Sequence, residues 1–168
     1  MHIQITNAVQ RDIAFIAKVC REMKELYDPI MEGASERQAK RYEEGGLPGN
    51  YNMRIISFES SYIGFEASKK LNEDVIYLVG FYLLKEYQRK GLGKETLNIL
   101  KNEAKSEKIK RIILLVHSKA NWAIDFYVKN GFRIVGRSQG EVVAFQHEMN
   151  EYYINNTCLM CCDLKYFL

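Results

Sequence analysis

Apolar and polar residues alternate with two different periods along the first third of the chain. The segment HIQITNA (residues 2–8) alternates at every second position, which predicts a short strand. Apolar residues at helical spacing predict a helix over residues 9–27, which ends before Pro29. A second, polar helix is expected over residues 35–45, with Ser35 as its N-cap. GGLPGN (45–50) is typical of a loop.

Strand patterns dominate the rest of the chain. Three strand-like segments, joined by spacers short enough for antiparallel hairpins, are MRIISFES (53–60), YIGFEASKK (62–70) and DVIYLVGFYLLKEY (74–87). A helix is expected from Leu92 to about Lys108, followed by the apolar strand RIILLVH (111–117). The remaining predicted elements are a short helix in NWAIDFYVKNG (121–131) and strands in FRIVGRSQG (132–140) and TCLMCCDL (157–164).

The order of these elements predicts an α/β (α+β) fold. The strand–helix–strand unit from Val75 to His117 implies a parallel pair with a right-handed crossover. The other strands favour a mixed, mostly antiparallel sheet of six or seven strands with about four helices. We expect residues 1–168 to form a single domain, because no repeat, low-complexity segment or linker interrupts them.

Composition adds little to this fold prediction. The chain has 168 residues, 47% of them hydrophobic and 27% charged, as in ordinary globular proteins. No signal peptide pattern is visible, and the longest apolar run, Val75–Leu84, is too short to cross a bilayer. We therefore expect a cytoplasmic protein that does not interact with membranes.

Three of the four cysteines lie together near the C-terminus. Cys158, Cys161 and Cys162 form C-x-x-C-C, with only His147 near in sequence. A metal site would need a second pair of ligands at suitable spacing. We predict no metal site and a strand in which cysteine acts as a small apolar residue, and the sequence leaves a redox or metal role for this group undecided.

Positive charge is concentrated in one segment. The net charge of +3 is mild, but residues 85–111 hold nine Lys or Arg and four Glu. Most of these charges mix signs on one predicted helix, as a solvated face does. Arg89, Lys90 and Lys94 differ because they flank Gly91 and Gly93.

The segment QRKGLG (88–93) has the form Q-x-x-G-x-G and lies between an apolar strand and a helix. Glycines let a backbone approach a bulky anion, and the free N–H groups of a helix start favour phosphate. The pattern differs from the dinucleotide motif G-x-G-x-x-G and from the P-loop. A nucleotide-phosphate site of another kind is indicated.

A second motif, A-I-x-F-Y-x-x-x-G-F, runs from Ala123 to Phe132. With Q-x-x-G-x-G before it, and with this order of elements, the chain resembles the GCN5-related N-acetyltransferase (GNAT) superfamily. The resemblance is strongest over residues 75–136. It implies acetyl-CoA as cofactor, a splayed parallel strand pair at the cofactor site, and direct transfer of an acetyl group to a primary amine.

The resemblance also implies roles for individual residues. Backbone groups of Phe81, Tyr82 and Leu83 would pair with the pantetheine arm, and an N–H near Leu83 would polarise the thioester carbonyl. Tyr127 would protonate the leaving thiolate, or it is only an aromatic core residue. The pyrophosphate would be held by the loop residues Gln88, Arg89, Lys90, Gly91, Leu92, Gly93 and Lys94.

Three features depart from the family pattern, and one of them, the glutamine that begins the loop in place of arginine, is tolerated by many members. Asn121 lies one position closer to the alanine than the usual asparagine does, so it would contact the pantetheine arm or only cap a helix. Tyr77 and Val79 stand where several members carry a glutamate base, which leaves the general base unidentified. The other acidic candidates are expected to be solvated strand or turn residues: Glu59, Glu66, Glu73 and Asp74.

The acceptor is less well marked than the donor. It could be a small amine or polyamine, an amino sugar or antibiotic, or a protein amine, bound by the first two helices and the loop at residues 28–51. Glu32, Glu36, Glu43 and Glu44 could attract a cationic amine there, or form a solvated acidic face. The resemblance leaves a homodimer open.

Other function classes are considered as alternatives. The chain could be a non-catalytic acyl-CoA sensor, since the strand glutamate is missing. A nucleic-acid-binding module using residues 85–111 is disfavoured by the scarcity of aromatic residues there, and we expect no nucleic-acid partner. His117 next to Ser118 could suggest a hydrolase, but no G-x-S-x-G motif surrounds a serine.

Overall fold

The computed structural model describes residues 2–165, and its contacts divide the chain into two compact units. The first unit contains the residues up to Lys69 together with Gly80–Thr96. The second contains Lys70–Val79 and the residues from Leu97 onward. The ends of the predicted domain, residue 1 and residues 166–168, lie outside the described residues.

Among residues 2–165, seven strands follow the order β1-β2-β3-β4-β5-β7-β6. β4 and β5 form the predicted parallel pair, and the other described pairings are antiparallel, which confirms the mixed α/β fold class. The strands are β1 (Ile3–Asn7), β2 (Asn52–Phe58), β3 (Ser61–Asn72), β4 (Val75–Leu83), β5 (Arg111–His117), β6 (Arg133–Gly136) and β7 (Thr157–Asp163).

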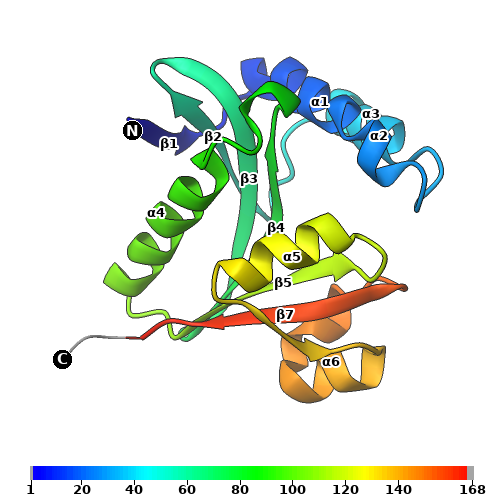
Figure 1. Cartoon of the computed structure of the whole chain (residues 1–168), viewed down its shortest axis with the longest axis vertical. Helices are drawn as coiled ribbons and strands as arrows, with labels where there is room; N and C mark the ends of the chain where they lie inside the picture. The colour runs from blue at the N-terminus through cyan, green and yellow to red at the C-terminus, as the bar shows by residue number, and fades with distance from the viewer. Residues whose placement is uncertain (1, 166–168) are drawn as a thin grey trace. The chain divides into compact units, whose positions relative to one another are not determined.

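Along the sequence, most helices of the first unit come after β1 and before β2. They are η1 (Gln10–Asp12), α1 (Ile13–Glu22), α2 (Lys24–Tyr27) and α3 (Ala34–Gly45), and α3 packs against α1 and α2 (Figure 1). The predicted apolar stripe is buried at Ile16, Ala17, Cys20 and Met23. The single helix predicted for residues 9–27 is wrong, because the chain leaves helical geometry at Met23.

The predicted N-cap of the second helix is also wrong. Gly33, in the left-handed conformation, precedes α3, and Ser35 is its second residue. Ser35 donates from its N–H and from its Oγ to the carboxylate of Asp28, at 3.1 Å each. Asp28 therefore satisfies a free N–H of the first turn of α3, a role that a side chain distant in sequence can take as well as a local cap.

The second unit pairs β5 with β7 and β7 with β6 in antiparallel register. Its core contains Val75, Tyr77, Ile113, Leu159 and Cys161, all buried. α4 (Leu92–Ser106), which starts in the first unit, and α5 (Asn121–Lys129) match the predicted helices. Apolar residues at helical spacing along α4 are buried: Leu92, Leu97, Leu100 and Ala104.

Two successive helical elements of the second unit were not predicted. α6 (Gln139–Phe145) and η3 (His147–Glu151) follow β6, which ends at Gly136 rather than near Gly140. Ser138 caps α6 by accepting the Glu141 N–H, and Glu141 in turn accepts the Arg137 N–H (2.8 Å). Ser138 and Glu141 have the S-x-x-E spacing of a capping box, so a local signal for this helix was present.

No helix among residues 2–165 is both long enough and apolar enough to span a bilayer.

Candidate functional site

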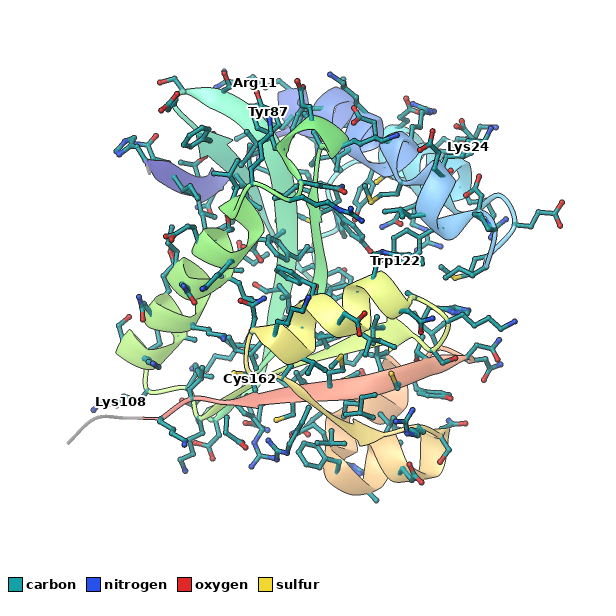
Figure 2. All side chains as sticks on the ribbon, viewed as in Figure 1. Arg11, Lys24, Tyr87, Lys108, Trp122 and Cys162 are labelled. Atoms are coloured by element: carbon teal, nitrogen blue, oxygen red, sulfur yellow. The ribbon has the colours of Figure 1, made fainter. Side chains whose placement is uncertain are left out.

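The C-terminal end of β4 is joined to the glycine loop by a side chain. Gln88, the first residue of Q-x-x-G-x-G, donates from Nε2 to the carbonyl oxygen of Leu83 (2.9 Å). Between them, η2 (Lys85–Tyr87) turns the chain, with the Tyr87 N–H donating to Leu84 O (2.9 Å). Tyr87 is labelled in Figure 2 directly before this loop. These two hydrogen bonds, both within the first unit, therefore fix the position of the loop relative to the end of β4.

The loop then enters α4 through two left-handed residues. Arg89 has φ 58° and Gly91 has φ 80°. α4 begins at Leu92, and its first backbone bond runs from the Glu95 N–H to Gly91 O (3.1 Å). The N–H groups of residues 92–94 thus have no intrahelical acceptor, as at every helix start.

Positively charged residues flank these N–H groups in the sequence. Arg89, Lys90 and Lys94 are exposed, and Gly91 between them is exposed too. Leu92 is buried and anchors the helix start, packing with Ile56, Ile63 and Leu83. Free amides, positive charge and an open glycine together form a site suited to a phosphate group.

The parallel pairing between β4 and β5 is short. Its register joins Val75 to Arg111, Ile76 to Ile112 and Tyr77 to Ile113. The next two residues of β4 in the second unit, Leu78 and Val79, have no partner on β5 in this register. β4 therefore leaves its parallel neighbour after three residues, as a splayed pair does.

The last residues of β4 sit in an aromatic part of the first unit. The Tyr82 ring lies 5.5 Å from the Phe65 ring and 6.3 Å from the Tyr27 ring, measured between centroids. Phe81 packs beside the small core around Leu83. Burial raises the pKa of the Tyr27 hydroxyl still further above physiological pH.

Two glycines of this region were not recognised as site residues from the sequence. A β-carbon on Gly64 of β3 would lie 2.1 Å from the carbonyl oxygen of Tyr82, and one on Gly80 would lie 3.0 Å from the Tyr82 ring. A glycine inside a strand indicates a bulge or a close backbone approach, so the isolated glycines in YIGFEASKK and DVIYLVGFYLL were the available signal.

Tyr127 and Asn121 both lie on α5 in the second unit. The Tyr127 ring makes edge contacts with Phe126 and Phe132, with centroids 5.2 and 5.3 Å apart. Asn121 is exposed and is the first residue of α5, while Ala120 occupies the N-cap and no side chain caps the helix. The alternative that Asn121 caps α5 is therefore wrong.

Glu66 corrects another expectation. It is fully buried and forms an ion pair with Arg54, directly opposite it in the antiparallel ladder of β2 and β3. The prediction that Glu66 is solvated is therefore wrong. Cross-strand neighbours of opposite charge attract, and Arg54 compensates the buried carboxylate. Glu59, Glu73 and Asp74 do lie in turns or beside them.

The two positions that replace the family glutamate are part of the core of the second unit. Tyr77 is buried, its ring lies tilted beside that of Tyr152 with centroids 5.5 Å apart, and Val79 packs against the same cluster. Neither side chain can serve as a carboxylate base.

His117 and Ser118 do not form a nucleophile pair. His117 Nδ1 accepts the Lys119 N–H (3.1 Å), while Ser118 Oγ donates to Asn156 O (3.0 Å). Burial and Lys119 lower the pKa of His117, which favours the neutral ring with its proton on Nε2. The hydroxyl proton of Ser118 thus goes to a backbone carbonyl instead of a base.

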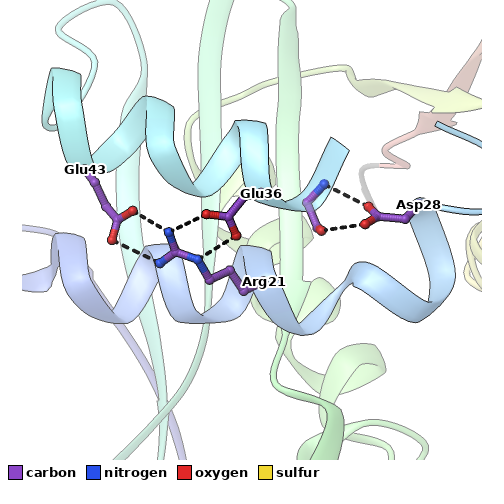
Figure 3. A network of polar contacts seen from close by, with 5 residues as sticks. Arg21, Asp28, Glu36 and Glu43 are labelled. Carbon is purple, nitrogen blue, oxygen red and sulfur yellow. Dashed lines mark hydrogen bonds and ion pairs between the residues drawn. The ribbon is translucent and has the colours of Figure 1, made fainter. Parts of the chain in front are cut away.

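Two of the three glutamates of α3 bind an arginine of α1. Arg21 binds Glu36 through Nε and Nη2 and Glu43 through both Nη atoms, at 2.6–3.0 Å (Figure 3). These bonds lower the pKa of both carboxyls. Glu36 and Glu43 therefore join two helices of the first unit, which limits their availability for a cationic amine.

The cysteines are buried. Cys158, Cys161 and Cys162 lie on β7, where Figure 2 labels Cys162, and Cys20 lies on α1. None of the four is in a disulfide. Across residues 2–165, no three His, Cys, Asp or Glu side chains gather where they could hold a metal ion.

The sequence matches the model of the acetyltransferase (GNAT) family over residues 20–132. No curated protein is similar enough to match the chain. Among solved structures, the PaiA N-acetyltransferase of Thermoplasma acidophilum, crystallised with coenzyme A, is 23% identical with a TM-score of 0.76, covering 97% of this chain and 99% of that one.

Two further structures share the fold at lower identity. The ribosomal-protein-S18-alanine N-acetyltransferase of Escherichia coli is 16% identical with a TM-score of 0.64, over 99% of this chain and 97% of that one. Tetrahymena GCN5 is 14% identical with a TM-score of 0.70, over 100% and 99%.

Proposed function

The chain belongs to the acetyltransferase (GNAT) family, and we propose that it transfers the acetyl group of acetyl-CoA directly to a primary amine. Acetyl-CoA is the acyl donor of this family, and coenzyme A is bound in the structure of the Thermoplasma protein. The observation that carries the proposal is the strand–loop–helix segment formed by the end of β4, the glycine loop and the start of α4.

The strand–loop–helix segment has groups suited to bind acetyl-CoA. The free N–H groups at the start of α4, together with Arg89, Lys90 and Lys94, would hold the pyrophosphate. Gly91, with its left-handed φ and no side chain, would let the phosphates approach the backbone. The backbone of Phe81, Tyr82 and Leu83, where β4 has left β5, would pair with the pantetheine arm.

The reaction needs no covalent enzyme intermediate. The neutral amine attacks the thioester carbon, a C–N bond forms, and the carbonyl electron pair moves onto oxygen. The N–H of Leu83 would stabilise this oxyanion. The oxygen electron pair then re-forms the carbonyl as the C–S bond breaks, the electron pair of that bond leaves on sulfur, and the nitrogen loses a proton to solvent.

Tyr127 would supply the proton that the thiolate takes up. A phenol has an ordinary pKa of about 10 and a thiol one of about 8.5, so the transfer depends on positioning. The contacts with Phe126 and Phe132 restrain the Tyr127 ring in the second unit. Asn121 would add a polar contact to the pantetheine arm.

The acceptor would be bound by α1, α2, α3 and the segments that join them. The aromatic rings of Tyr27 and Tyr82 lie on this side of the first unit, and Glu36 and Glu43 are held by Arg21. A primary amine attached to an apolar or aromatic group suits such surroundings better than a polycation does.

Acetylation of a panel of amines tests the proposal. The purified chain is mixed with acetyl-CoA and, in separate reactions, a polyamine, an aryl-alkyl amine, an amino sugar, and peptides with a free N-terminus or lysine. Release of the CoA thiol should require both enzyme and amine, and mass spectrometry should find the acetylated product. Tight CoA binding without thiol release for any amine would favour the acyl-CoA sensor instead.

A further inference from the structure

Gly64 lies where β3 passes the last peptide of β4. A β-carbon at this position would be 2.1 Å from Tyr82 O, 2.8 Å from Leu83 Cδ2 and 3.0 Å from Leu83 Cα. Two of these three neighbours are backbone atoms. A side chain at Gly64 could therefore be accommodated only if the backbone of β4 itself moved.

The approach of Tyr82 O to Gly64 sets the direction of the next N–H. No cis peptide bond occurs in the described chain, and in a trans peptide the C=O and N–H point in opposite directions. Because Tyr82 O faces Gly64, the N–H of Leu83 points away from β3. The following N–H, that of Leu84, points back and donates to Ile63 O (2.7 Å).

The carbonyl oxygen and the side chain of Leu83 are also held in place. Leu83 O accepts the Gln88 side chain (2.9 Å), and the Leu83 side chain is buried beside Ile56, Ile63 and Leu92. The Leu83 carbonyl and the Leu84 N–H, which belong to the next peptide, are thus each held by a hydrogen bond. The direction of the Leu83 N–H itself follows from the Tyr82 carbonyl that faces Gly64.

We propose that Gly64 is a positioning residue for acetyl transfer: its missing side chain lets Tyr82 O face β3, so that the Leu83 N–H is directed from the opposite side of β4 toward the thioester oxygen. This inference rests on the proposed function, because it concerns the oxyanion that forms during transfer. Gly64 itself touches neither donor nor acceptor.

Replacement of Gly64 by alanine tests the role, with Gly140→Ala as the matched control because a β-carbon there meets nothing within 4 Å. If Gly64→Ala folds, kcat should fall at least about tenfold per folded molecule, since losing one oxyanion donor costs about 10²–10³-fold in other enzymes. The Kd for CoA should change less than about threefold. A variant that folds and keeps its kcat would overturn the proposal.

Two measurements apply even if Gly64→Ala does not fold. In the wild-type protein, the ¹H and ¹⁵N shifts of the Leu83 amide should differ between the acetyl-CoA and CoA complexes, while the Leu84 amide shifts stay the same. Replacing the Leu83 N–H by an ester oxygen should lower kcat at unchanged CoA affinity. Identical Leu83 shifts in the two complexes, or an unimpaired ester variant, would refute the role.

The same measurements separate this inference from the proposed function. If wild type binds acetyl-CoA but acetylates no amine, the transferase proposal fails. The Leu83 shift then still shows whether its N–H meets the thioester carbonyl.

Discussion

The side chain of Gln88 donates a hydrogen bond to the backbone carbonyl of Leu83, joining the start of the glycine loop to the end of β4. Leu83 is also the residue whose N–H we assign to the thioester oxygen. Leu83 therefore takes part in both the contact with the loop and the proposed contact with the thioester.

Gln88→Leu should weaken CoA binding. A neutral hydrogen bond contributes about 0.5–1.5 kcal/mol, so the Kd for CoA should rise by about 2- to 10-fold, as measured by titration calorimetry. Gln88→Arg keeps a donor at this position and is the control, expected to bind nearly as wild type does. Equal losses in both variants would show that the hydrogen bond is not what matters.

Tyr127→Phe should lower turnover while the ring contacts with Phe126 and Phe132 persist. General acid catalysis typically contributes 10²–10⁴-fold, so we expect kcat to drop by about 100-fold with little change in CoA affinity. Steady-state kinetics and a thermal melt give both quantities. An unchanged kcat would reduce Tyr127 to a packing residue.

Gly91→Glu should abolish CoA binding. A non-glycine residue at φ 80° is strained by roughly 1–2 kcal/mol, and the added carboxylate repels phosphate from the free N–H groups. Gly49→Glu adds the same charge to another exposed glycine, which has open space around it, and should bind CoA normally. If both variants bind CoA equally well, the loop is not the pyrophosphate site.

Arg21→Gln should make stability less dependent on pH in the acid range. Arg21 lowers the pKa of Glu36 and Glu43 in the folded state, so its contribution is present above about 4.5, the ordinary carboxyl value, and is lost as the pH falls through the lowered values. Urea midpoints at pH 7 and pH 3.5 should differ more in wild type than in the variant. If the midpoint changes by the same amount between the two pH values in both proteins, these ion pairs do not contribute to stability.

The native thiols should react slowly with Ellman's reagent. Burial raises the pKa of Cys20 to about 12 and that of Cys161 to about 11, and both side chains are enclosed. At pH 8 we expect little labelling within minutes in buffer and four thiols in urea. Fast labelling of the native protein would indicate an accessible, reactive cysteine, and it would also interfere with CoA thiol detection.

The strand–loop–helix segment of the proposed donor site could be predicted from the sequence because its signals are local. An apolar run, glycines flanked by basic residues and a helical stripe from Leu92 to Ala104 each depend on neighbours in the chain. β1, α4, β5, α5 and β7 were predicted for the same reason. The cap of α6 was a local signal too, and it was missed.

Other features depend on residues far apart in the sequence. The contact between Gly64 and Tyr82, the ion pair of Arg54 with Glu66, and the bonds of Arg21 to Glu36 and Glu43 arise only when strands and helices pack. Glu66 looks like a solvated residue in sequence, yet the ladder places it opposite Arg54 in the interior. The sequence by itself determined the chemistry of the proposed donor loop, whereas tertiary structure decided the direction of the Leu83 N–H, because a peptide's orientation depends on what packs against it.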